Sequence, residues 1–249
     1  MFFSLLSYFT SGNQILIIYA LVTLLLRIPA MLLSLSIHEA AHGWMANKLG
    51  DPTARNLGRI TINPLKHLNP LGALSMLIFG VGWANPVPIN SRYFKKPKRD
   101  MALTAIAGPL SNLVQGFVAT ALMIVGTRLF FGSIGYEGSD VLFFYYFSKI
   151  IDGTMIEKIV CILFALLWIY ATLNFSLALF NLIPIPPFDG SRLAFVFLPD
   201  KYYFGIMKYE RYIMFGFLAL FYFFGDALGT IFSLFIELVF LSFSWVLLI

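Results

Sequence analysis

Residues 14–42 read QILIIYALVTLLLRIPAMLLSLSIHEAAH, and this stretch decides the fold class. Residues 14–37 are predominantly apolar and carry one charge, on Arg27. A run of about 20 apolar residues in a helix crosses the hydrocarbon core of a bilayer, so residues 14–37 predict a transmembrane helix. We expect the helix to continue through His42 to about residue 47, which gives it a polar end.

That polar end carries His38 and His42, with Glu39 between them. Residues four apart lie on one helix face, so both imidazoles can bind one metal ion, and Glu39 can act on a water bound to that ion. This HExxH spacing is typical of zinc hydrolases. Such a short pattern also arises by chance. However, ionisable residues beside a membrane helix favour a functional interpretation.

Composition indicates that the whole chain is a membrane protein. Hydrophobic residues make up 59% of its 249 residues and charged residues 12%, against about 25% charged in a soluble domain. We therefore predict an all-α polytopic membrane protein with a single transmembrane domain over residues 1–249, its core at about 14–200 and further C-terminal helices at about 211–249. The single Cys161 allows no internal disulfide and is expected to be a packing residue.

Hydropathy predicts about five transmembrane helices. Their expected ranges are 14–37, 102–127, 158–182, 211–225 and 228–249. Between the first two, residues 71–81 are apolar but too short to span, which predicts a re-entrant or interfacial segment. Residues 83–90 (WANPVPIN) contain prolines and asparagines that disfavour a helix. They form either an extended edge that binds an extended peptide by strand addition or a proline-rich turn.

Loop charge predicts the orientation in the cell membrane. Residues 47–100 contain nine basic and two acidic side chains, and residues 190–211 add four basic ones. Residues 128–158 carry four acidic side chains against three basic ones. Because basic loops stay in the cytoplasm, the first two loops are expected to be cytoplasmic, with the N-terminus outside and the C-terminus inside. The net charge of +5 is thereby explained by the bilayer, without a nucleic-acid partner.

A catalytic zinc ion usually has three protein ligands and one open position, so a third ligand is needed. The next glutamate after Glu39 is Glu137, on the predicted opposite side. Asp189 lies on the same predicted side as the histidines, in NLIPIPPFDG (181–190). Prolines end the preceding helix at membrane depth, where irregular backbone must line protein or a wet cavity, and a carboxylate there favours a cation. Alternatively, Asp189 is the N-cap of a helix beginning near Ser191; the ligand interpretation is favoured.

Three motifs in this order resemble the site-2 protease family of intramembrane zinc metalloproteases. They are HEAAH at 38–42, GPLSN at 108–112 and NLIPIPPFDG at 181–190. The run GRITINPLKHLNPLG at 58–72 is similar to the compact bacterial and archaeal branch, which has no PDZ domain. The resemblance covers about residues 15–200.

This resemblance implies one zinc ion per chain, held by His38, His42 and Asp189, with Glu39 as the catalytic base. It also implies hydrolysis of peptide bonds within or near transmembrane segments, so that the partner is a transmembrane protein substrate in the lipid bilayer. Such a reaction needs a hydrogen-bond donor for the developing oxyanion. Asn112 and Asn181 are candidates, although either could instead bond a neighbouring helix.

Two further points stay open in the sequence. His67 is a structural histidine, or it lines the cytoplasmic mouth, or it binds a second metal transiently. The competing function is a non-hydrolytic zinc-binding membrane protein, a transporter or a sensor. Transporters tend to carry ligands on several helices, whereas two of the three histidines here share one motif. Glu39 distinguishes the two functions, because it is dispensable for binding metal but not for hydrolysis.

Overall fold

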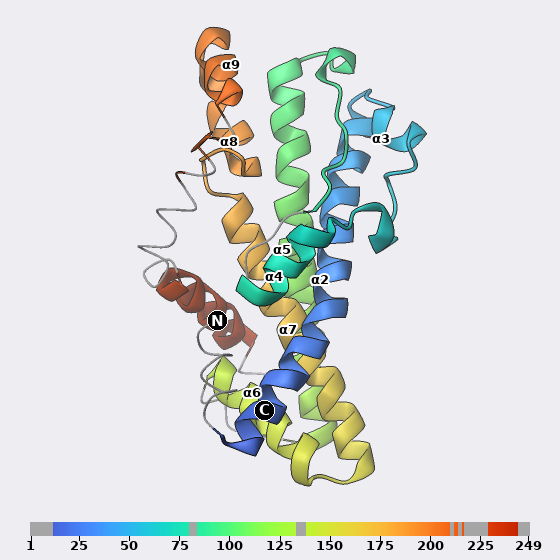
Figure 1. The fold of residues 1–249 in the computed structure, drawn as a ribbon, viewed down its shortest axis with the longest axis vertical. Helices are drawn as coiled ribbons and strands as arrows, with labels where there is room; N and C mark the ends of the chain where they lie inside the picture. The colour runs from blue at the N-terminus through green and yellow to red at the C-terminus, as the bar shows by residue number, and fades with distance from the viewer. Residues whose placement is uncertain are drawn as a thin grey trace.

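A computed structural model describes residues 12–79, 84–132, 138–209, 212–213, 216 and 229–243. Within these ranges the secondary structure is helical, with no strand. In the described part of the chain, three helices are long and apolar enough to cross a membrane: α2 (Gln14–Lys48), α5 (Pro97–Phe131) and α7 (Met155–Asn181). They run alongside one another as the body of the molecule (Figure 1). The predicted all-α class is therefore confirmed for the described residues, and the first three predicted spans each correspond to a long apolar helix.

Helix α2 begins at residue 14, as predicted, whereas α5 and α7 begin five and three residues before the predicted starts at 102 and 158. The Asn13 side chain accepts a hydrogen bond from the Ile15 amide at the start of α2. Helix α7 begins with a capping box, in which Thr154 and Glu157 bond each other's backbone amides. Such caps satisfy amides that have no partner inside the helix. Helix α5 begins at Pro97, a residue favoured in the first turn because it has no amide hydrogen to satisfy.

Shorter elements connect the long helices. In chain order they are α3 (Thr53–Asn56), η1 (Pro64–Lys66), α4 (Pro70–Phe79), η2 (Ser91–Tyr93), α6 (Ser139–Asp152), α8 (Asp189–Ala194), η3 (Phe195–Phe197) and α9 (Asp200–Lys208). Helix α4 lies against α2 partway along its length (Figure 1). With ten residues, α4 is too short to span a bilayer, as expected for residues 71–81, and its re-entrant or interfacial position stays a prediction. Residues 84–90 are irregular, and residues 80–83 lie outside the described part of the chain.

The last two predicted spans are not confirmed. Most of residues 211–225 lie outside the described residues. Of the fifth predicted span, the described residues form the apolar helix Gly229–Phe243, and residues 228 and 244–249 lie outside the described part of the chain.

Helix α6 was not expected, because residues 128–158 were interpreted from their charge as a loop. It lies at the opposite end of the bundle from α3, α8 and α9 (Figure 1). Its apolar face is buried at Leu142, Phe143 and Tyr146, and the Tyr146 hydroxyl lies 2.6 Å from Oγ1 of Thr127 on α5. Packing against α5 and α7 thus stabilises a helix whose acidic ends suggested a loop.

Close helix contacts depend on glycines in α5. A Cβ atom added at Gly116 would lie 2.6 Å from Phe175, and one at Gly126 would lie 2.8 Å from Phe164, both aromatic rings being on α7. Phe175 and Phe164 belong to the main apolar core between α5, α6 and α7. The core therefore fixes α5 against α7, and the polar site described next lies nearer the end where α2 and α7 finish.

Candidate metal centre

Three ionisable side chains converge where α2, α5 and α8 meet. The Nε2 atoms of His38 and His42 on α2 lie 3.0 Å apart. Oδ2 of Asp189, the first residue of α8, lies 3.3 Å from Nε2 of His38 and 3.2 Å from Nε2 of His42. Both histidines are buried, and Asp189 is partly buried. Among the described residues this is the one group of three or more such side chains with ligand atoms close enough to share an ion.

Hydrogen bonds from the far side of each ring orient the two histidines. Nδ1 of His42 lies 2.8 Å from the carbonyl oxygen of Thr104 on α5. Nδ1 of His38 bonds the amide oxygen of Asn112, also on α5. Because both partners are acceptors, each Nδ1 carries the hydrogen and each Nε2 presents a lone pair to the centre. Metal-binding histidines are commonly oriented in this way.

The spacing of the three ligand atoms fits a zinc ion. Atoms about 2.0–2.1 Å from a tetrahedral zinc lie about 3.3–3.4 Å apart, and the observed separations are 3.0–3.3 Å. Oδ2 of Asp189 is buried and accepts no hydrogen bond. Two lone pairs and an unsatisfied carboxylate oxygen facing one another repel unless a cation lies between them. The side chains present therefore fit zinc.

Helix α5 can approach the imidazoles only because residue 108 is glycine. A Cβ atom at Gly108 would lie 2.4 Å from Nε2 of His42 and 2.6 Å from Cε1 of His38. No side chain fits there without displacing the two rings. The sequence analysis used Gly108 only as part of the GPLSN motif. The glycine-proline pair within an apolar helix was the feature that could have indicated a close helix contact there.

The chain folds back sharply after α7 to place Asp189. A Cβ atom at Gly190 would lie 2.3 Å from the carbonyl oxygen of Leu182, just beyond the end of α7, so this turn also requires glycine. The alternative role of Asp189 as a helix N-cap is wrong, because Phe188 occupies that position and no side chain caps α8. The carboxylate instead points at the imidazoles.

The Glu39 carboxylate contacts the irregular segment at residues 84–90. Its Oε2 accepts a hydrogen bond of 2.9 Å from the backbone amide of Val87. Arg59 binds the same segment by donating to the carbonyl oxygens of Asn85 at 2.7 Å and Pro86 at 3.2 Å. These contacts fix the backbone of the segment beside Glu39.

The geometry agrees with a comparison of sequences. The model of peptidase family M50 matches residues 27–223, which include the histidines and Asp189. The chain belongs to peptidase family M50. One relative in this comparison is "Putative zinc metalloprotease YwhC" of Bacillus subtilis, 38% identical over 77% of each chain. "Putative zinc metalloprotease Rip2" of Mycolicibacterium smegmatis is 30% identical over 43% of this chain and 41% of its own. "Putative zinc metalloprotease Rip2" of Mycobacterium tuberculosis is 26% identical over 66% of this chain and 53% of its own. No solved structure matches the chain.

Asn112 and Asn181, the two candidate oxyanion donors of this M50 protein, make different hydrogen bonds. Asn112 is fully buried; its Oδ1 accepts from His38 and its Nδ2 donates to Asn174 on α7 at 2.7 Å. That is the interhelical bonding given above as the alternative to an oxyanion role. Nδ2 of Asn181 donates to the carbonyl oxygen of Leu177 in its own helix at 3.0 Å. Asn174 carried no motif signal, and sequence reasoning missed it.

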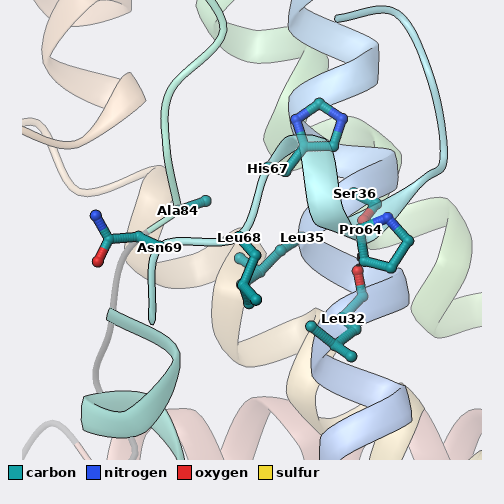
Figure 2. Close-up of a pocket in the computed structure, with 8 residues that line it drawn as sticks. All are labelled: Leu32, Leu35, Ser36, Pro64, His67, Leu68, Asn69 and Ala84. Carbon is teal, nitrogen blue, oxygen red and sulfur yellow. Dashed lines mark hydrogen bonds between the residues drawn. The ribbon is translucent and has the colours of Figure 1, made fainter. Parts of the chain in front are cut away.

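His67 lies outside the M50 metal group. It is buried, and its Nε2 bonds the carbonyl oxygen of Thr61 at 2.9 Å. Figure 2 shows the pocket that His67 lines together with Leu32, Leu35 and Ser36 of α2. The hydrogen bond to the nearby backbone fits the structural role among those left open, and among the described residues His67 belongs to no group of three or more possible metal ligands.

Proposed function

We propose that this M50 protein is an intramembrane zinc metalloprotease that hydrolyses peptide bonds within or near transmembrane segments of membrane-protein substrates. The observation that carries the proposal is the convergence of His38, His42 and Asp189 beside Glu39, at the polar end of a helix long enough to span a bilayer. We infer one zinc ion per chain, because the described residues form one such group.

His38, His42 and Asp189 would hold the zinc ion. When bound there, the ion would polarise the scissile carbonyl and lower the pKa of the attacking water. Glu39 takes the proton from the attacking water and delivers it to the leaving amine. The hydrogen bond from the Val87 amide holds the Glu39 carboxylate in place while it does so.

We further propose that the end of the bundle with α3, α8 and α9 faces the cytoplasm and that α6 faces the outside. The basic ranges 47–100 and 190–211 contain α3, α8 and α9, which lie together at one end, and α6 lies at the other (Figure 1). An excess of lysine and arginine at one end of a helical bundle is what the positive-inside rule expects on the cytoplasmic side. A transmembrane substrate then reaches the site from the lipid, near the cytoplasmic side.

The deciding experiment compares purified wild type and Glu39→Gln on candidate membrane substrates in proteoliposomes, with zinc content measured in parallel. The amide cannot accept the proton of water but leaves all three ligands in place. We therefore expect full zinc occupancy and a cleavage rate lower by about 10²–10⁴-fold. Cleavage by Glu39→Gln at the wild-type rate would refute the mechanism. Zinc movement across the bilayer by both proteins, with cleavage by neither, would establish the transporter alternative.

A further inference from the structure

Four buried polar side chains form a line of hydrogen bonds from the metal group through the bundle. His38 on α2 bonds Asn112 on α5. Nδ2 of Asn112 donates to Oδ1 of Asn174 on α7 at 2.7 Å, and Nδ2 of Asn174 donates to Oγ of Ser34 on α2 at 2.8 Å. Asn112, Asn174 and Ser34 are fully buried. The line thus leaves α2 at His38 and returns to α2 one turn earlier.

The direction of these bonds is fixed at the Asn174 end by carbonyl oxygens. Nδ2 of Asn174 also lies 2.8 Å from the carbonyl oxygen of Tyr170, which can only accept. The Ser34 hydroxyl donates its one hydrogen to the carbonyl oxygen of Ala30 at 2.8 Å, so its oxygen is left to accept from Asn174. Both contacts require the amide nitrogen of Asn174 on that side and its oxygen toward Asn112.

The orientation of the Asn174 amide determines that of the Asn112 amide, and through it the tautomer of His38. Because Asn174 presents an oxygen, Asn112 must turn its nitrogen toward Asn174 and its own oxygen toward His38. An oxygen there accepts a hydrogen only from a protonated Nδ1, which leaves Nε2 of His38 unprotonated and able to bind a metal. The tautomer of His42 does not depend on a side-chain amide, because Nδ1 of His42 bonds the backbone carbonyl oxygen of Thr104, which can only accept.

We propose that Asn174 is a positioning residue for zinc, which selects the metal-binding tautomer of His38 by fixing which end of the Asn112 amide faces the ring. This inference rests on the proposed zinc site. Without Asn174 the Asn112 amide is free to turn, and its nitrogen would then favour the His38 tautomer with hydrogen on Nε2, which cannot bind zinc.

The test measures zinc affinity by competition with a chromogenic chelator, and thermal unfolding in parallel, on the full chain in detergent. We expect Asn174→Leu to weaken zinc binding by about 10–100-fold, the usual effect of losing a group that orients a ligand. Thr127→Val is the matched control, because it also removes a fully buried interhelical hydrogen bond, that between Thr127 and Tyr146. It lies 15 residues beyond Asn112 on α5 and should leave zinc affinity unchanged.

A second substitution separates positioning from a general loosening of the bundle. Asn112→Asp presents an oxygen to His38 whichever way it turns, so Asn112→Asp combined with Asn174→Leu should regain near-wild-type zinc affinity. A loosened site would not recover in this way.

Should Asn174→Leu not fold, Asn174→Ser removes the amide with a smaller, polar side chain. Wild-type affinity in the folded Asn174 variant, or no recovery in the double variant, would overturn the inference. Failure of the wild type to bind zinc would refute the proposed function instead.

Discussion

Replacing Gly108 by alanine should remove zinc while leaving the bundle folded. The added Cβ would lie 2.4 Å from Nε2 of His42 and 2.6 Å from Cε1 of His38. Ordinary contacts between such atoms are about 3.5 Å, so either α5 or the two rings must move by about 1 Å. Zinc ligands hold their distances within about 0.2 Å. We therefore expect zinc affinity to fall at least about 10–100-fold, as when ligands are misoriented.

Gly116→Ala provides a matched control for crowding. Its Cβ would lie 2.6 Å from Phe175, a similar clash eight residues further along α5, against the apolar core rather than the ligands. Both variants should be destabilised by about 1–3 kcal/mol through overpacking, seen as a lower midpoint of thermal unfolding. Elemental analysis after gel filtration should find zinc in Gly116→Ala and not in Gly108→Ala. Full occupancy in Gly108→Ala would refute the argument that this glycine makes room for the bound imidazoles.

Three further outcomes are expected. Asp189→Ala should lose zinc on gel filtration while remaining helical by circular dichroism; full occupancy would remove Asp189 from the ligands. Exhaustive chelation of the wild type should abolish cleavage of a membrane substrate, and added zinc should restore it; cleavage that persists without metal would contradict a metalloprotease. In oriented membranes, Lys96→Cys and Lys201→Cys should react with impermeant thiol reagents only from the cytoplasm and Met155→Cys only from outside. Native Cys161 is fully buried and should stay unlabelled; labelling of position 96 from outside would reverse the orientation.

The positions of the three candidate ligands could be predicted from the sequence, because each depends on a local rule. His38 and His42 are brought together by helical periodicity alone. Asp189 was placed on their side by loop charge and by the prolines that end the preceding helix. The same rules located α2, α5 and α7, because long apolar runs are the strongest signal that a membrane chain carries.

What the sequence did not reveal depends on contacts between distant segments. The bond between Asn174 and Ser34 joins residues 140 positions apart, and nothing in either residue's neighbourhood indicates it. The need for glycine at position 108 follows from how closely α5 passes α2. Helix α6 was missed because its stability comes from the packing of Tyr146 and its neighbours on α5 and α7. The number of charged residues in a segment carries no information about such packing.

The residues proposed to hold zinc come from widely separated parts of the chain, since Asp189 follows His38 by 151 residues. A single ion held there would act as a cross-link that ties the first long helix to the segment after α7. Because the unfolded chain cannot bring these groups together, the ion would bind only the folded state. It would add a stability that grows with zinc concentration, about 2.7 kcal/mol at a hundredfold excess over its dissociation constant. Loss of metal would then loosen the junction between the two ends of the core, as well as stop hydrolysis.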